Sequence, residues 1–190
     1  MEKYSYDQSD FKEIERGGMI YRLCRIVALR DIHNPRLFVK AGEKGGYVFP
    51  DGLSQEGESW VDQGSVIGPQ CEVAGNALVQ QSYLGRNVVV KDNAVVTKST
   101  LEFAPRGIEI SGRGRVVSSY LQGNIRVSGE AAVVRSKMFG NINVFGIANV
   151  YDCNVESNST LEIANREYYV GKTILAQGNE HRGVEKRLGR

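Results

Sequence analysis

Two histidines are the side chains best suited to general base chemistry near neutral pH, and they stand towards the two ends of the chain. They are His33 and His181, the only imidazoles among 190 residues. An imidazole can take a proton from an acceptor hydroxyl or amine. His33 is therefore the candidate catalytic base, with a solvated loop histidine as the default interpretation. Two histidines cannot supply a three-histidine zinc site, and we expect no metal.

Basic side chains gather in the middle of the sequence and could bind an anion. They are Arg106, Arg113, Arg115, Arg126, Arg135 and Lys137. Guanidinium groups match phosphate geometry, so the cluster could hold a phosphate of coenzyme A or of a nucleotide. No phosphate-cradling glycine loop accompanies it. The favoured interpretation is a solvated face whose charge Glu72, Glu109 and Glu130 balance.

A seventeen-residue period specifies the elements that must position these groups. Successive aliphatic anchors are separated by six, five and six residues, and the pattern then repeats. The interval between Leu101 and Ile110 is three residues longer than the others of its kind. The anchors are Val73, Val79 and Leu84; Val90, Val96 and Leu101; Ile110, Val116 and Leu121; Val127, Val133 and Met138; Val144, Val150 and Val155. Such a period is typical of a solenoid, whose repeats bury apolar faces against their neighbours.

Small or apolar residues stand two places before each anchor, as on the inner face of a strand. Each coil is therefore predicted to hold three short strands. Before the third anchors stand Ser82, Ser99, Ser119, Ser136 and Cys153. These serines have no histidine near them in the repeat, so inward packing is favoured over a nucleophile. Turn residues mark the corners: Gly75, Gly112, Gly129 and Gly146, and Asn87, Asn124, Asn141 and Asn158.

The repeat frame also assigns surface positions. Lys98 and Arg135 fall at equivalent corners, with Lys137 and Tyr120 close by, which makes these four the candidate anion-binding residues. Outward apolar residues flank the second anchors on one side of the coil: Leu78, Val95, Val117, Val134 and Tyr151. An exposed stripe of this length indicates a subunit interface. The alternative is that a cap or the C-terminal tail covers it.

The sequence divides into three segments. Residues 1–59 are predicted to cap the open end of the solenoid, residues 60–164 to form the coils, and residues 165–190 to form a C-terminal cap and basic tail. Within the first segment we expect a short helix over residues 8–16 and a strand over residues 19–29. We also expect a hairpin of residues 37–40 with residues 46–49.

Composition excludes several classes of partner. A formal net charge of +2 is too mild to indicate nucleic acid. No apolar stretch approaches a membrane span of about 18 residues, so no membrane is expected. The three cysteines, Cys24, Cys71 and Cys153, lack metal or disulfide spacing. Cys71 and Cys153 hold inward positions as buried thiols, and we expect a cytoplasmic location.

Units such as Val73-Ala-Gly-Asn-Ala-Leu resemble the hexapeptide repeat of left-handed β-helix proteins. Ala41-Gly-Glu-Lys-Gly-Gly-Tyr-Val48 and Leu53-Ser-Gln-Glu-Gly-Glu-Ser-Trp-Val61 resemble the lead-in of YdcK-like hexapeptide-repeat proteins of bacteria and their phages. This resemblance covers roughly residues 22–163. It implies an all-β, single-stranded left-handed parallel β-helix that forms a homotrimer. Gly123-Asn-Ile and Gly140-Asn-Ile echo bactofilin-type scaffolds, whose end-to-end polymerisation the inferred caps would block.

Two functions follow. The first is a non-catalytic trimeric binding or scaffold module for a protein or a small anionic ligand, needing no cofactor. The alternative is an acyltransferase of the hexapeptide-repeat class, using acyl-coenzyme A or acyl carrier protein. Such acyltransferases usually place a histidine on a coil or on a loop from one, and the predicted coils contain none. The first function is therefore preferred.

Overall fold

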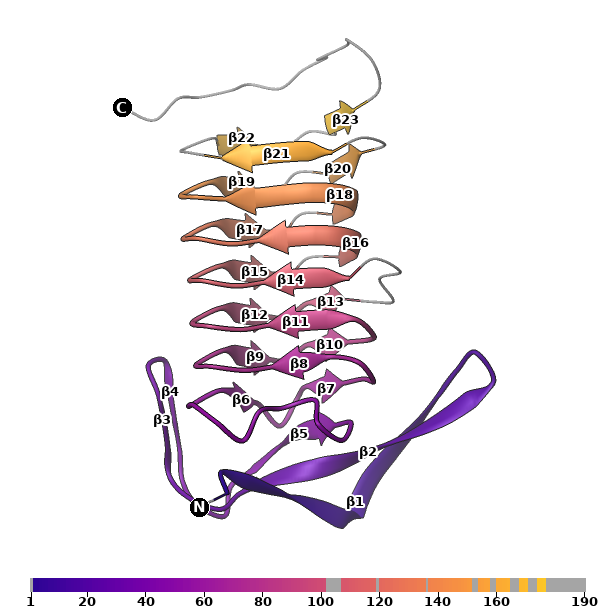
Figure 1. Cartoon of the computed structure of the whole chain (residues 1–190), viewed down its shortest axis with the longest axis vertical. Coiled ribbons are helices and arrows are strands. Elements are labelled where there is room, and N and C mark those ends of the chain that lie inside the picture. Colours follow the sequence, from indigo (N-terminus) through magenta and orange to yellow (C-terminus); the bar gives the residue numbers. More distant parts are fainter. Residues whose placement is uncertain are drawn as a thin grey trace.

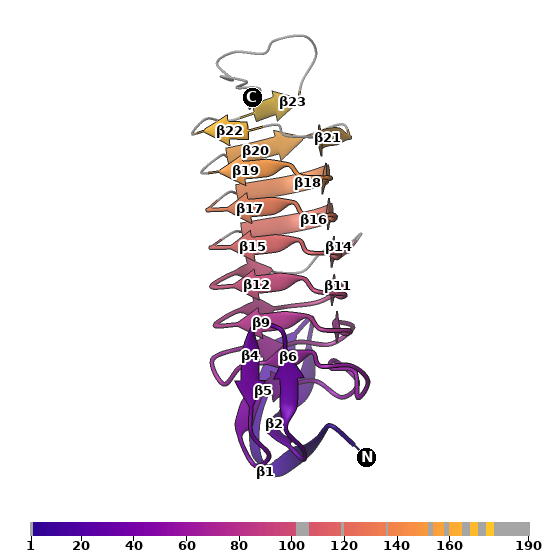
Figure 2. The same cartoon turned by 90° about the vertical axis from the view of Figure 1, so that its left-hand side faces the viewer.

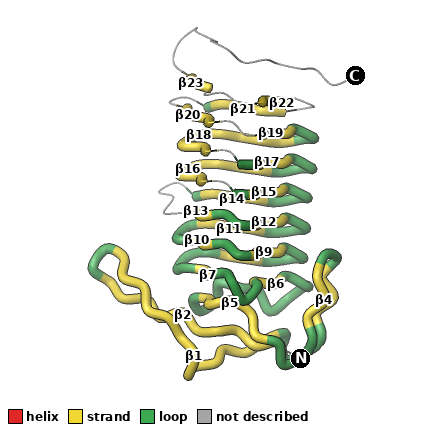
Figure 3. The backbone as a smooth tube through the Cα atoms, turned by 180° about the vertical axis from the view of Figure 1, so that it is seen from behind, coloured by secondary structure: helices red, strands yellow, loops and turns green. Residues whose placement is uncertain are grey.

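The computed structural model describes residues 2–101, 107–118, 120–135, 137–151, 154–157, 160–164, 168–170 and 174–176. These residues form a column of stacked coils, with strands and connecting loops and no helix (Figures 1 and 3). The strands of successive coils pair in parallel, so the all-β solenoid of about 17 residues per coil is confirmed.

Each coil has three faces. Face one holds β8 (Glu72–Val73), β11 (Val88–Val90), β14 (Ile108–Ile110), the ends of β16 (Tyr120–Val127) and β18 (Lys137–Phe145), and β21 (Leu161–Ala164). Face two holds β6 (Trp60–Val61), β9 (Leu78–Gln80), β12 (Val95–Thr97), β15 (Arg115–Val117), β17 (Ala132–Val134), β19 (Asn149–Tyr151) and β22 (Tyr168–Val170). Face three holds β7 (Val66–Ile67), β10 (Tyr83–Leu84), β13 (Thr100–Leu101), the starts of β16 and β18, β20 (Asn154–Ser157) and β23 (Ile174–Ala176).

The predicted anchors stack in register. On face two, Val79 lies opposite Val96, Val96 opposite Val116, and Val116 opposite Val133, and all four are fully buried. Anchors on the other faces stack in the same way, from Ile67 to Met138 on face three. Burying such a side chain contributes about 1.5–3 kcal/mol, so the stacked columns are the core.

Left-handed backbone turns the chain at most of the described corners. Gly75, Gly112, Gly129 and Gly146 turn it from face one to face two with φ values of 67°, 66°, 71° and 70°. Asn87, Asn124 and Asn141 turn it from face three to face one with φ values of 57°, 48° and 54°. These corner assignments are confirmed, and Asn158 lies outside the described residues.

The N-terminal segment caps the column through sheet pairing. β1 (Tyr4–Arg16) and β2 (Met19–Ala28) form an antiparallel hairpin, and β2 pairs with β5 (Lys44–Val48). β5 then pairs in parallel with β7, the first strand of face three. A bridge between Leu53 and Val73 adds a contact below face one. The cap thus gives backbone partners to the lowest coil, as a solenoid end requires.

Two expectations for the cap are wrong. Residues 8–16 form part of β1 instead of a helix, because their backbone pairs with β2 from Phe11 opposite Cys24 to Arg16 opposite Met19. The expected hairpin of residues 37–40 with 46–49 is absent as well. β4 (Leu37–Val39) pairs with β3 (Ile32–Asn34), while β5 is taken up by β2 and β7. The strand expected over residues 19–29 is confirmed as β2.

Candidate functional site

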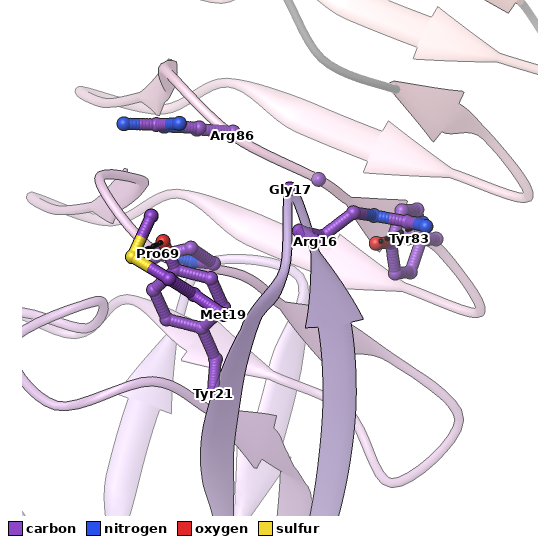
Figure 4. A pocket seen from close by; sticks show the side chains of 8 residues that line it. Arg16, Gly17, Met19, Tyr21, Pro69, Tyr83 and Arg86 are labelled. Carbon is purple, nitrogen blue, oxygen red and sulfur yellow. Dashed lines mark hydrogen bonds between the residues drawn. The ribbon is translucent and has the colours of Figure 1, made fainter.

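A pocket of about 450 Å³ opens between the cap and the column. Residues 11–23, the part of the β1–β2 hairpin beyond its contact with β5, project sideways from the foot of the column and are called the arm below (Figure 1). The arm tip faces the corner between faces three and one. The pocket is lined by Arg16, Gly17, Met19 and Tyr21 of the arm and by Pro69, Tyr83, Gly85 and Arg86 of the coils (Figure 4).

The arm tip is a tight turn held against the coils. Gly17 and Gly18 have φ values of 59° and 75° and join Arg16 to its strand partner Met19, as in a two-residue type I′ turn. Arg16 Nη2 donates a hydrogen bond of 2.9 Å to the hydroxyl of Tyr83. Its guanidinium carbon lies 5.9 Å from the centre of the Tyr83 ring. This polar contact, with some cation–π character, holds the tip against β10.

The opposite side of the pocket combines an arginine with apolar walls. Nε–H of Arg86 donates to Oε1 of Gln70, which sits one coil below. Met19, Tyr21 and Pro69 lie together on this side of the arm tip (Figure 4). The Tyr21 ring packs edge-on to Phe49 at 5.7 Å between centres. The described lining residues thus place two arginines beside the apolar side chains of Met19, Tyr21 and Pro69.

His33 stands away from this pocket. It lies on β3, its side chain is exposed, and its ring lies 5.0 Å from that of Phe38 on the outer side of the β3–β4 hairpin. Its backbone N–H donates to the Glu58 carboxylate at 2.7 Å. The described geometry gives its imidazole a packing contact, and its role as a catalytic base stays a prediction. His181 lies outside the described residues.

The four candidate anion-binding residues lie near one edge of the column. Lys98, Ser118 and Arg135 follow one another at the corner between faces two and three, with φ values of 53°, 52° and 51°. Tyr120 pairs with Lys137 at the start of the next strands, although the Tyr120 side chain lies outside the described residues. Lys98, Arg135 and Lys137 are exposed. The four residues thus gather on one edge of the column, and their role as an anion site stays a prediction.

Other basic residues in the middle coils have acidic neighbours. Glu109 carboxylate oxygens lie 2.7 Å from Lys91 Nζ and 3.7 Å from Arg126 Nε. Glu130 Oε1 lies 3.0 Å from Arg113 Nη1. These pairs match the charge-balanced face that was favoured, and exposed pairs of this kind add little stability.

The serine column is structural where it is described. Ser65, Ser82 and Ser99 are buried. Oγ of Ser65 accepts the N–H of Ser82 and Oγ of Ser82 accepts the N–H of Ser99, both at 3.1 Å. Ser65 also donates to the Asp62 carboxylate at 2.6 Å and Ser82 to the Gln80 carbonyl at 2.7 Å, so these two hydroxyls are committed in both directions. Ser99 donates to the Thr97 carbonyl at 3.1 Å. Ser119, Ser136 and Cys153 lie outside the described residues.

The apolar stripe on face two divides into a covered and an open part. Leu78 and Val95 share one column and are buried at 1% and 6% exposure. Val117, Val134 and Tyr151 share the neighbouring column; the two valines are half-buried and Tyr151 is 37% exposed. The β3–β4 hairpin lies along the foot of this face, below β12 (Figure 2). The predicted alternative of a covering cap thus applies to the lower two residues.

Polar side chains fasten that hairpin to three successive coils. Asn34 Nδ2 donates to the carbonyls of Glu58 and Asn76 at 2.9 and 2.8 Å, and Arg36 Nη1 donates to the carbonyl of Asn93 at 2.8 Å. Its inner residues Ile32 and Val39 belong to the same buried cluster as Leu78. The hairpin is therefore a fixed cover of the lower stripe.

Buried thiols are inert in this structure. Cys24 and Cys71 are buried and not in disulfides. Burial raises the pKa of Cys71 to about 11, so its thiol keeps its proton near neutral pH. Among the described residues, no three histidine, cysteine or acidic side chains form a metal-binding group. Within the same residues, no helix is long and apolar enough to cross a membrane.

Comparison with known proteins assigns no family. No protein-family model matches the chain, and no curated protein matches it. The described coils are compatible with a β-helix repeat protein, which is the part of the expected resemblance that stands.

Sequence reasoning missed the pocket under the arm. Its residues come from both sides of the predicted segment boundary, with Arg16 and Tyr21 in the cap and Tyr83 and Arg86 in the coils. The signal that could have found the arm is Arg16-Gly17-Gly18-Met19, because Gly-Gly between two extended runs is typical of a tight hairpin. No local pattern indicates that the tip reaches β10.

Proposed function

We propose that this protein is a non-catalytic binding and scaffold module that assembles as a homotrimer. The observation that supports it is the stripe on face two. The chain covers Leu78 and Val95 with its own hairpin, and the apolar side chains of the neighbouring column, Val117, Val134 and Tyr151, lie beyond that cover. Rigid stacked coils suit a scaffold because they hold such a column straight over several repeats.

The assembly is tested by the mass of the particle in solution. Light scattering after size exclusion should give three chains for the wild type and one for the double variant Val117→Glu/Val134→Glu, since two carboxylates would be buried without partners at the interface. Val89→Glu is the matched control, a half-buried outward valine on face one, and it should remain trimeric. A monomeric wild type would end the proposal.

The finer family assignment belongs to the same proposal. Left-handed winding and membership of the YdcK-like hexapeptide-repeat proteins are supported by the lead-in motifs at Ala41–Val48 and Leu53–Val61. In the structure, β5 and the bridge from Leu53 join these motifs to the first coil, which suits a lead-in role. A cytoplasmic location is supported by the reduced, buried Cys24 and Cys71.

An acyltransferase is the second candidate, and the shared corner of Lys98 and Arg135 favours it as a place for a phosphate. Coenzyme A and acetyl-coenzyme A should then raise the melting temperature, because a ligand bound to the native state stabilises it. The shift should be lost in Arg135→Ala and kept in Arg113→Ala. Thiol release from acetyl-coenzyme A that depends on His33 would replace the non-catalytic proposal with this one.

A further inference from the structure

We propose that a groove on face two binds a phosphate monoester of a small hydroxylated molecule. The groove has a volume of about 450 Å³, which lies within the usual range of small-molecule sites. It lies between the turn of the β3–β4 hairpin and β15, and its lining residues are Arg36, Leu78, Gln80, Val95, Thr97 and Arg115. All of them belong to one chain, so the proposal goes beyond the scaffold role and does not depend on the trimer.

The pairing of successive coils brings most of these side chains to the outer surface of face two. Arg115 lies opposite Val95 and Val95 lies opposite Leu78, so the arginine stands one coil above two buried apolar residues. Thr97 lies opposite Gln80 in the neighbouring outward column. The groove therefore combines a cationic end, an apolar floor and a side of neutral polar groups.

Arg36 brings a second guanidinium to the groove from the cap. It lies in the turn of the β3–β4 hairpin, which runs along the foot of face two (Figure 2). Its backbone N–H donates to Asn34 Oδ1 at 3.0 Å, and its Nη1 donates to the Asn93 carbonyl at 2.8 Å, at the corner before β12. The second bond orients the guanidinium. Among the described residues no acceptor meets its Nε–H or Nη2–H groups, which therefore stay available to a ligand.

The described surroundings leave the positive charge of the groove unbalanced. No described carboxylate forms an ion pair with Arg36 or Arg115. The structure describes face two and its flanking corners throughout residues 74–82, 91–99, 111–118 and 128–135. The acidic residues of these ranges are Asp92, which accepts a backbone N–H at 2.8 Å, and Glu130, which lies 3.0 Å from a guanidinium of the coil below. Two guanidiniums that face one cavity repel each other, and a bound anion removes that repulsion.

A phosphate monoester fits this arrangement better than a carboxylate does. Near neutral pH it carries a charge of about −1.5 to −2 and three acceptor oxygens, which two guanidiniums can share. A carboxylate is satisfied by the fork of a single arginine. Gln80 and Thr97 offer donors and acceptors to the rest of the ligand, while Leu78 and Val95 are buried and present little apolar surface. The body that carries the phosphate is therefore small and hydroxylated instead of a long apolar chain.

Calorimetric titration tests the ligand class with defined probes. Glycerol 3-phosphate and ribose 5-phosphate are small hydroxylated monoesters, ribose and inorganic phosphate supply the parts separately, and succinate supplies two carboxylates. At least one monoester should bind saturably, about tenfold or more tighter than ribose, inorganic phosphate and succinate. Absence of saturable binding by both monoesters overturns the proposal, and so does inorganic phosphate or succinate binding as tightly as they do. A phosphoserine peptide that binds tighter than either monoester would also overturn it, because the phosphate would then belong to a protein partner.

Charge variants locate the binding. Arg115→Leu should weaken the monoester about tenfold or more, and it should fold normally because this exposed side chain makes no described hydrogen bond or ion pair. Arg126→Leu removes an exposed arginine from face one and should leave the affinity unchanged. Arg135→Ala, at the separate corner between faces two and three, should leave it unchanged as well. Loss of binding in Arg135→Ala with wild-type affinity in Arg115→Leu would assign the phosphate to that corner and refute the groove.

Two conservative variants test the other contacts. Thr97→Val keeps the shape of the side chain and removes its hydroxyl, so it should weaken the monoester about threefold to tenfold and leave inorganic phosphate unchanged. Arg36→Lys keeps the charge and loses the fork, so it should weaken both. Unaltered affinities in both variants would show that the monoester binds outside the groove. Particle mass is measured apart from binding: a monomeric wild type that binds a monoester would end the trimer and keep this site, and a trimer that binds neither would do the reverse.

Discussion

Lys3 shows what a single charged residue costs when the cap buries it. Its side chain has no exposed surface, and its ammonium donates to the Ser59 hydroxyl at 3.0 Å and to the Glu56 carbonyl at 3.2 Å. Burial lowers the pKa of Lys3 to about 8, although the Glu58 carboxylate acts in the opposite direction. Two neutral acceptors thus compensate only part of the lost hydration.

This lowered pKa predicts how stability changes with pH. Between pH 8 and the ordinary value of 10.5, the unfolded chain holds a proton that folded Lys3 has lost, so the free energy of unfolding rises with pH. Urea unfolding at pH 7 and pH 9.5 should show the wild type gaining about 1–2 kcal/mol relative to Lys3→Met. The exposed Lys40→Met serves as control and should show no such trend. A difference between wild type and Lys3→Met that does not vary with pH would contradict the prediction.

At the scale of the elements, two glycines with similar backbone conformation allow the effect of a positive φ to be distinguished from the effect of stacking between coils. Gly129 and Gly17 have φ values of 71° and 59°. A Cβ on Gly129 would lie 2.6 Å from the carbonyl oxygen of Gly146 in the next coil, whereas a Cβ on Gly17 meets nothing within 4 Å. Only the stacked corner therefore adds a steric clash with a neighbouring coil to the strain of a positive φ.

Alanine at each position should reveal that difference. Gly17→Ala should cost about 1 kcal/mol, the strain of a left-handed alanine, and Gly129→Ala should cost at least about 2 kcal/mol because the coils must also move apart. Denaturant unfolding of both variants measures the comparison. Equal costs would mean that the stacked corner relaxes without disturbing the next coil.

The β3–β4 hairpin depends on an ion pair that acid should weaken. Both Glu58 oxygens accept hydrogen bonds from Arg30, at 2.8 and 3.2 Å, and one also accepts the His33 N–H. The Arg30 guanidinium, as the main cause, lowers the pKa of Glu58 below its ordinary 4.5. A lowered carboxyl pKa contributes stability that is present above the ordinary value and is lost as pH falls through the folded value.

Glu58→Gln should therefore destabilise the protein by about 1 kcal/mol at pH 7, a modest figure because both partners are partly solvated. The difference from the wild type should shrink as the pH falls below the ordinary value of 4.5, since Glu58 then gains a proton in the wild type too. Thermal unfolding at pH 7 and pH 3.5 measures both, with exposed Glu72→Gln as control. A deficit as large at pH 3.5 as at pH 7 would assign the effect to packing instead of charge.

Elements of the column were predictable from the sequence, whereas most of those of the cap, β2 excepted, were not. The spacing of Val79, Val96 and Val116 in the sequence predicts that they stack on one another, because each coil repeats the environment of the previous one. In residues 8–16 of β1, Phe11 and Ile14 stand three places apart among polar residues, so no alternation indicates a strand there. β5 lies where it does because Gly45 lets β6 approach: a Cβ there would lie 2.7 Å from the Val61 carbonyl oxygen. The covered Leu78 and the pocket at Arg86 likewise depend on segments that meet only in the folded chain.

At the scale of the whole molecule, the stability of each coil should depend on the coils directly above and below it. Each described strand of face two from β9 to β19 pairs with one strand below and one above, while β22 pairs only with β19 among the described residues. In such a stack, free energy is approximately a sum of coil terms and nearest-neighbour terms. Local opening should therefore be cheapest towards the later coils and dearest near β12, between the cap and those coils.

Hydrogen exchange in the wild type and in Val116→Ala tests this coupling. The wild type should show slowest exchange in β9, β12 and β15 and faster exchange in later strands. Truncating Val116, fully buried in β15, creates a small cavity that should cost about 1–3 kcal/mol. Its effect on exchange should be largest in β15, smaller in the paired β12 and β17, and smallest in β6, because each coil contacts only its neighbours. Equal acceleration in every strand would show that the column and cap open as a single cooperative unit.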